Sequence, residues 1–173
     1  MIEAAIFIVF PFCMAYAAIS DMLSMTIANR VSLLLVGSFM VVAPLTGMDL
    51  SAYGWHLAAG LMVLTVTFTL FAIGGMGGGD AKLLAATALW MGFGPALLSY
   101  LVYSAALGGL LTILILAYRG SPLAVYTGHR LFLRNLADRD LGVPYGMALG
   151  VGGLLAFAES PLLLWAMSSA AGQ

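Results

Sequence analysis

The sequence predicts an all-α, polytopic integral membrane protein with about six transmembrane helices. Of the 173 residues, 63% are hydrophobic and 8% are charged, whereas a soluble domain carries about 25% charged residues. The mean hydropathy is +1.09. Apolar runs close to the length of about 20 residues that crosses a bilayer follow one another along the chain. We therefore expect one membrane-embedded domain that occupies residues 1–173.

The first three expected helices are apolar runs at residues 4–20, 29–46 and 56–74. Ala15-Tyr16-Ala17 in the first run resembles a signal-peptidase site, but Glu3 precedes the run without any Lys or Arg, so we expect a retained helix. The second run has no charge after Arg30, and the third has none at all.

The last three expected helices lie at residues 81–94, 97–118 and 142–158. The fourth is short because glycines precede it and Gly94-Pro95 follows it. The fifth is one apolar run. The sixth can continue beyond Ser160-Pro161 into the apolar residues 162–167.

The basic residues predict the orientation. In this topology all of them fall on one side, at Arg30, Lys82, Arg119, Arg130, Arg134 and Arg139. The other side carries Glu3, Asp49 and Glu159. Because basic loops stay in the cytoplasm, we expect both termini outside and the loops that bear Asp21 and Asp80 in the cytoplasm.

Composition also excludes several classes of function. The net charge of −1 and the pI of about 6.0 provide no basic field for nucleic acid. The single cysteine, Cys13, excludes an internal disulfide and a multi-cysteine zinc site. His56 and His129 fall on opposite sides of the predicted topology and cannot form a metal pair. We expect neither a metal nor a cofactor.

Asp21 and Asp80 are ionisable residues at the edges of predicted spans, where a charged side chain is costly and so needs an explanation. Alone, Asp21 can be a solvated interfacial residue and Asp80 can be the N-cap of the fourth helix. The topology brings both to the cytoplasmic interface. Two carboxylates about 4 Å apart would repel by roughly 4 kcal/mol at an effective dielectric of 20, so one would be protonated and the other ionised. An aspartyl peptidase uses that state.

A glycine run, Gly74-Gly75-Met76-Gly77-Gly78-Gly79, precedes Asp80. Each glycine costs about 1 kcal/mol in a helix interior, so we expect close backbone approach or a mobile loop that admits an extended substrate. The run lacks the Gly-Lys-Ser/Thr of a phosphate-binding loop, so we expect no nucleotide site.

Three blocks together resemble the type IV prepilin peptidase family. Gly77-Gly78-Gly79-Asp80 followed by Lys82 matches its Gly-x-Gly-Asp-x-Lys motif. Ser20-Asp21 with Ile27-Ala28-Asn29 downstream is similar to its Asp followed by Ile-Pro-Asn, with Ala28 in place of the proline. Val143-Pro144-Tyr145-Gly146 resembles the Pro-Tyr-Gly block of the small members found in tight-adherence (Flp) pilus systems.

The resemblance implies that Asp21 and Asp80 are the catalytic pair of a peptidase in the bacterial inner membrane. It implies prepilin and pseudopilin precursors as substrates, cut at the cytoplasmic face, and the pilus assembly machinery as a partner beside the lipid bilayer. The residues expected to support the site or the substrate are Gly77, Gly79, Lys82 and Asn29. The chain lacks the cytoplasmic domain with paired cysteines of longer members, so methyl transfer is not expected.

Simpler roles stay open for several of these residues. Lys82 can steady the ionised carboxylate, bind the substrate or snorkel to the interface. Asn29 can hydrogen-bond near the site or cap the second helix. Pro144 fits a first helical position, and Tyr145 fits an interfacial aromatic anchor.

Two other functions are also open. In a small transporter component, Asp21 and Asp80 would carry protons or cations and the glycines would form a broken helix. Their position at one interface, without inverted halves, argues against transport. A non-catalytic assembly factor would hold pilus subunits through small residues such as Gly108-Gly109.

Overall fold

The computed structural model describes residues 1–127, 135–138 and 141–172, which contain helices and no strands. The helices are α1 (Ile2–Ser24), α2 (Asn29–Leu45), α3 (Leu50–Ala72), α4 (Gly78–Met91), α5 (Pro95–Arg119), α6 (Pro122–Thr127), α8 (Tyr145–Phe157) and α9 (Pro161–Ala170). The all-α prediction is confirmed for this part of the chain.

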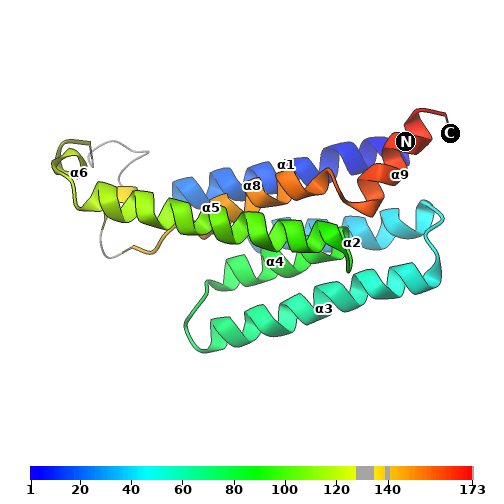
Figure 1. Cartoon of the computed structure of the whole chain (residues 1–173), viewed down its shortest axis with the longest axis horizontal. Coiled ribbons are helices and arrows are strands. Elements are labelled where there is room, and N and C mark those ends of the chain that lie inside the picture. The colour runs from blue at the N-terminus through cyan, green and yellow to red at the C-terminus, as the bar shows by residue number, and fades with distance from the viewer. Residues whose placement is uncertain (128–134, 139–140, 173) are drawn as a thin grey trace.

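The helices form a bundle whose two chain termini lie at one end and whose α6 lies at the other (Figure 1). Helix α8 packs between α1 and α5, and α4 packs against α2, α3 and α8. Residues Leu83–Met91 of α4 are all buried, so this short helix is the centre of the fold. Helices α1 and α3 end, and α2, α4 and α8 begin, at the end of the bundle that is remote from the termini (Figure 1).

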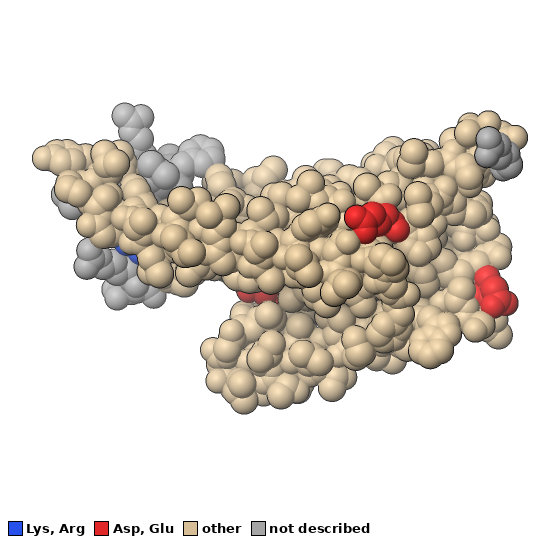
Figure 2. All heavy atoms as spheres, in the orientation of Figure 1, with Lys and Arg blue, Asp and Glu red and all other residues tan. Residues whose placement is uncertain are grey.

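Three helices, α1, α3 and α5, are long and apolar enough to cross a membrane. Helices α8 and α9 reach the required length only as a pair that bends by 46° at the break between them. Helices α2 and α4, with 17 and 14 residues, are shorter. A membrane protein is therefore supported, whereas the count of six spans and the orientation of the termini stay predictions. One face of the molecule is almost free of charged side chains (Figure 2).

Several helix ends differ from the predicted ones because local capping decides them. Helix α3 begins at Leu50, six residues before the predicted start, because the Asp49 carboxylate accepts a hydrogen bond of 3.1 Å from the Ser51 N–H. The helix predicted at residues 142–158 corresponds to α8, and its possible continuation beyond Ser160-Pro161 is a separate helix, α9. The Ser160 hydroxyl caps α9 by accepting a hydrogen bond from the Leu163 N–H, and Pro161 occupies the first turn.

Aromatic side chains fill the core between α1, α2, α4 and α8. Phe10 stacks on Phe157, with ring centroids 4.2 Å apart, and the buried Trp90 donates a 2.9 Å hydrogen bond to the Leu35 carbonyl. His56 is also buried here, with Nδ1 2.6 Å from the Leu89 carbonyl oxygen. Its role is therefore structural; the other histidine, His129, lies outside the described residues.

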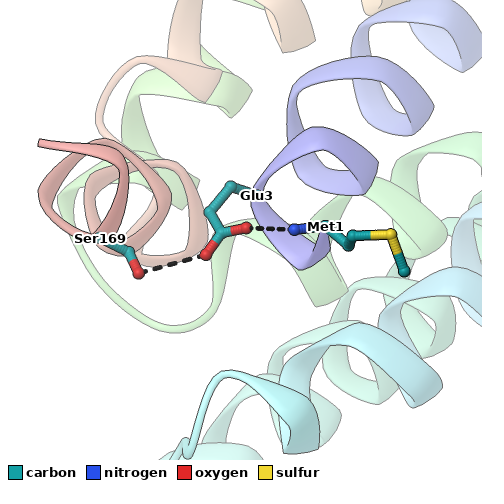
Figure 3. A network of polar contacts seen from close by, with 3 residues as sticks. All are labelled: Met1, Glu3 and Ser169. Carbon is teal, nitrogen blue, oxygen red and sulfur yellow. Dashed lines mark hydrogen bonds and ion pairs between the residues drawn. The ribbon is translucent and has the colours of Figure 1, made fainter. Parts of the chain in front are cut away.

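A small polar network joins the two ends of the chain (Figure 3). The Glu3 carboxylate forms a 2.8 Å ion pair with the Met1 amino group and accepts a 3.2 Å hydrogen bond from the Ser169 hydroxyl. The contact fastens the start of α1 to α9. It closes the end of the bundle that is remote from both candidate catalytic aspartates.

Candidate active site

Asp21 lies in the last turn of α1 and is only 5% exposed. Its Oδ2 accepts a 2.7 Å hydrogen bond from the N–H of Gly146, the second residue of α8. The free N–H groups and the positive dipole at a helix N-terminus stabilise a carboxylate. Asp21 is thus a buried carboxyl group held in place by the start of another helix.

Gly146 is the residue that permits this contact. A Cβ atom at position 146 would lie 2.9 Å from Cβ and Cγ of Asp21 and 2.5 Å from Cδ1 of Ile27. Such distances are far shorter than van der Waals contact, so a larger residue would displace Asp21. The Pro-Tyr-Gly block therefore has a steric reason in this chain: its glycine brings α8 against the carboxyl group.

Asp80 is the third residue of α4 and is half-buried. The alternative that Asp80 caps this helix is wrong, because the N-cap residue is Gly77 and the helix begins at Gly78. Gly78 and Gly79 thus belong to the first turn of α4, whereas the predicted helix began at residue 81. A helix end tolerates glycine better than an interior because fewer intrahelical hydrogen bonds depend on it.

The predicted close approaches at Gly77 and Gly79 are present. A Cβ atom at Gly77 would lie 2.8 Å from Asp80 Oδ2, and one at Gly79 would lie 3.3 Å from Cβ of Ile27. Ile27 therefore contacts the start of α4 at Gly79 and the start of α8 at Gly146. The Ile27 side chain thus lies between the start of α4, which carries Asp80, and the start of α8, which binds Asp21.

Ala28, which stands where the family pattern has a proline, adopts a backbone conformation that proline can also adopt. Its φ of −64° and ψ of 133° lie in the region that proline favours. Ala28 is the N-cap residue of α2, and no side chain caps that helix. The alternative that Asn29 caps α2 is therefore wrong; Asn29 is the first residue of the helix.

Asn29 instead contacts Lys82. Lys82 Nζ donates a 2.9 Å hydrogen bond to Asn29 Oδ1, and both side chains are exposed. The described residues show no ion pair between Lys82 and either aspartate. The pair joins the start of α2 to α4 beside the site, and Lys82 is not held against a carboxylate.

The negative charge of Asp21 acts on Asp80. The pKa of Asp80, which lies in the first turn of the short helix α4, is raised to about 7 by burial and secondarily by the negative charge of Asp21. Among the described residues no hydrogen bond reaches the Asp80 carboxyl group. A carboxyl group with this pKa is partly protonated at neutral pH, so Asp80 can carry a proton there.

A cavity of about 470 Å³ opens beside Asp80. Its lining consists of Gly74, Gly75, Met76, Gly77, Asp80, Gly142, Val143 and Tyr145. Half of the lining residues are glycines, which leave room for a peptide main chain. The cavity can admit a water molecule and an extended peptide next to a carboxylic acid.

Tyr145 and Arg119 have roles near this cavity that the sequence did not predict. Tyr145 was expected as an interfacial anchor, but its ring lies against Gly108 of α5, where a Cβ atom would overlap with it, and lines the cavity. Gly108 therefore packs against a side chain of the same protein. Arg119 is buried, and its guanidinium group donates hydrogen bonds of 2.9 Å to the carbonyls of Leu136 and Gly142. It fixes the segment that forms one cavity wall, and no sequence motif signals this role.

Pro144 is the N-cap residue of α8 rather than its first helical residue. Its ring still restricts the backbone directly before Tyr145 and Gly146. Among the described residues no group of three or more His, Cys, Asp and Glu side chains could hold a metal ion. The chemistry available at the described site is that of two carboxyl groups, water and main-chain donors.

Comparison with known proteins identifies the family. The model of the type IV leader peptidase family matches residues 8–115, which include both aspartates and the glycine run. No curated protein and no solved structure is significantly similar to the chain. The family match covers more than half of the chain and agrees with the three sequence blocks. The chain therefore belongs to the type IV leader peptidase family.

Proposed function

We propose that the chain is a membrane-embedded aspartyl endopeptidase that removes the short N-terminal leader from Flp-type prepilins. The observation that carries the proposal is the electrostatic effect of Asp21 on Asp80, although the two are 59 residues apart in the sequence. The family match supports a leader peptide as the substrate, and the Pro-Tyr-Gly block supports the Flp class.

The two carboxyl groups take different roles in the proposed reaction. Asp21, which accepts the Gly146 N–H, is the carboxylate that draws a proton from water. The water oxygen attacks the scissile carbonyl carbon while Asp80 donates its proton to the carbonyl oxygen. When the tetrahedral intermediate collapses, the C–N bond breaks, the amine takes the proton from Asp21, and Asp80 regains its own.

The active site faces the cytoplasm in this proposal, and six helices cross the inner membrane with both termini outside. Arg30 at the start of α2, Lys82 in α4 and Arg119 at the end of α5 support this orientation, because α2 and α4 begin and α5 ends at the side remote from the termini (Figure 1). Arg130, Arg134 and Arg139 lie outside the described residues.

The test is cleavage of a co-expressed Flp prepilin, read by the mass of the mature subunit. Wild type, Asp21→Asn and Asp80→Asn are compared, with membrane insertion measured for each. Asp49→Asn is a matched control, because Asp49 caps α3 and Asn caps a helix equally well. We expect cleavage by wild type and Asp49→Asn and none by the other two.

Two results would contradict the proposal. Cleavage by a well-inserted Asp21→Asn or Asp80→Asn variant would refute the two-carboxyl mechanism. A wild-type protein that is inserted but cuts no prepilin would refute the peptidase function.

A further inference from the structure

A second hollow, which we call the α3–α5 groove, runs along the bundle between these two helices. It has a volume of about 290 Å³ and is lined mainly by apolar side chains, among them Met62, Val66, Leu70, Leu101, Ala105 and Leu149, together with the hydroxyl-bearing residues Thr67, Ser104 and Tyr145. Helices α3 and α5 have few or no direct contacts with each other. Figure 2 shows a recess between the part of the surface formed by α5 and that formed by α3.

The groove adjoins the cavity of the candidate active site. Met76 and Tyr145 line both the groove and the cavity that contains Asp80. A larger groove of about 600 Å³ between α2, α3 and α4 shares no lining residue with that cavity, and it ends at Lys82 and Asn29. The lining shared with the Asp80 cavity therefore distinguishes the smaller groove from the larger one.

The lining of the α3–α5 groove defines the chemistry of its occupant. Met62, Val66 and Leu70 are spaced by four residues, so they follow one face of α3 over about 12 Å at 1.5 Å per residue. No charged side chain lines the groove. Val66 is 55% exposed on the apolar face of α3. A polypeptide in this environment must satisfy its own backbone hydrogen bonds, as a helix does.

We propose that the α3–α5 groove receives the apolar helix of the membrane-inserted precursor and guides its cleavage site to Asp80. The inference rests on the proposed function. The helix lies against Val66 and Leu101 and gives way to extended chain where it passes Met76 and Tyr145. The glycine backbone at Gly74 and Gly75 then lines the path of the extended segment into the Asp80 cavity.

Filling the groove tests the inference. Val66→Trp places an indole in the groove. Val102→Trp is a matched control, because Val102 is 54% exposed on α5 and is not among the groove residues. We expect Val66→Trp to lower kcat/KM for the full-length precursor about ten-fold, mainly through KM, which corresponds to loss of about 1.4 kcal/mol of binding. The control should stay within about two-fold of wild type.

The two proposals fail in different ways. If wild type does not cut, the proposed function is wrong. If wild type cuts and the two tryptophan variants cut alike, the groove inference is wrong and the function stands.

Photocrosslinking gives a second, independent readout. A photoreactive phenylalanine is placed at Val66 or at Leu33 of the larger groove in the Asp80→Asn variant, together with the precursor. The Leu33 side chain is 69% exposed and the Val66 side chain 55%, so Leu33 is at least as accessible to a partner. A crosslink to the apolar helix of the precursor from Val66 and not from Leu33 is expected. A crosslink from Leu33 alone would overturn the inference.

Discussion

The two aspartates are supported in different ways. Asp21 is 5% exposed, accepts a main-chain hydrogen bond and is enclosed by the close approach of Gly146. Asp80 is half-buried, faces a cavity and follows an exposed segment in which Gly74, Gly75 and Gly77 are all exposed. The contacts of Asp21 are made by helices α1 and α8, whereas the cavity beside Asp80 is lined mainly by loop backbone.

This difference fits a division of tasks. A general base must be held in one orientation, and a buried carboxyl with a fixed donor meets that need. A peptide must reach the acid, and a glycine-lined approach leaves space for its backbone. We infer that Asp21 is the fixed half of the site and that the Asp80 side is where the substrate enters.

The largest effect is expected from Gly146→Ala, which disturbs the contact between the start of α8 and Asp21. The new methyl group would meet Asp21 and Ile27 within 2.9 Å, so the carboxyl group must move. We expect about a hundred-fold loss of kcat, the scale of a misplacement of about 1 Å, and about 1–3 kcal/mol lower stability from overpacking. Prepilin cleavage and thermal unfolding in detergent measure the two.

Gly54→Ala in α3 is the control, because nothing lies within 4 Å of a Cβ atom there. It should keep both activity and stability. Equal activity of Gly146→Ala and Gly54→Ala would show that Asp21 does not need its present position.

The next effect concerns pH and sharpens the assignment of the acid. The pKa of Asp80 is raised from 3.8 to about 7, so its proton is present below that pH and is lost above it. Because the proposed reaction needs this proton, kcat should fall about ten-fold per pH unit above pH about 7. A pH series of cleavage rates measures it, and a rate that stays constant up to pH 9 would contradict the role of Asp80 as acid.

Asp21→Asn supplies the matching control for that pH dependence. Removing the Asp21 charge should lower the pKa of Asp80, but not to its ordinary value, since burial is the larger cause of the shift. Infrared titration of the protonated carboxyl band in this inactive variant measures the change. An unaltered pKa would mean that the two groups are not coupled.

A smaller effect is expected from Gly77→Ala at the cavity beside Asp80. The added methyl group would lie 2.8 Å from Asp80 Oδ2, but a half-buried carboxyl group can rotate away. We expect about a ten-fold or smaller loss of kcat with little change in stability, since a rotamer shift costs about 0.5–1.5 kcal/mol. If Gly77→Ala were as damaging as Gly146→Ala, the two sides would be equally rigid.

The smallest effect is expected from Lys82→Met. It removes the hydrogen bond to Asn29 but keeps the apolar stem, and both partners are exposed. An exposed hydrogen bond contributes about 1 kcal/mol or less, so cleavage should change by no more than about three-fold. A loss as large as that of Asp80→Asn would place Lys82 in the chemistry after all.

Sequence patterns predicted the helical regions well and their ends less well. The apolar runs located α1, α2, α3, α4, α5 and α8, because burial in lipid or in a core demands such runs. They did not predict the start of α3 or the division between α8 and α9. Those ends depend on the caps Asp49 and Ser160, which a hydropathy pattern does not register.

By itself, the sequence determined the membrane class, the family resemblance and the choice of Asp21 and Asp80, because charge is rare in this chain and its positions are therefore informative. Only the tertiary structure decided that Gly146 supports Asp21, that Ile27 spaces two helix ends and that Tyr145 lines the cavity. These are contacts between residues up to 125 positions apart. Such contacts depend on how α1, α4 and α8 pack, and helix packing is set by the shapes of many side chains together rather than by any local motif.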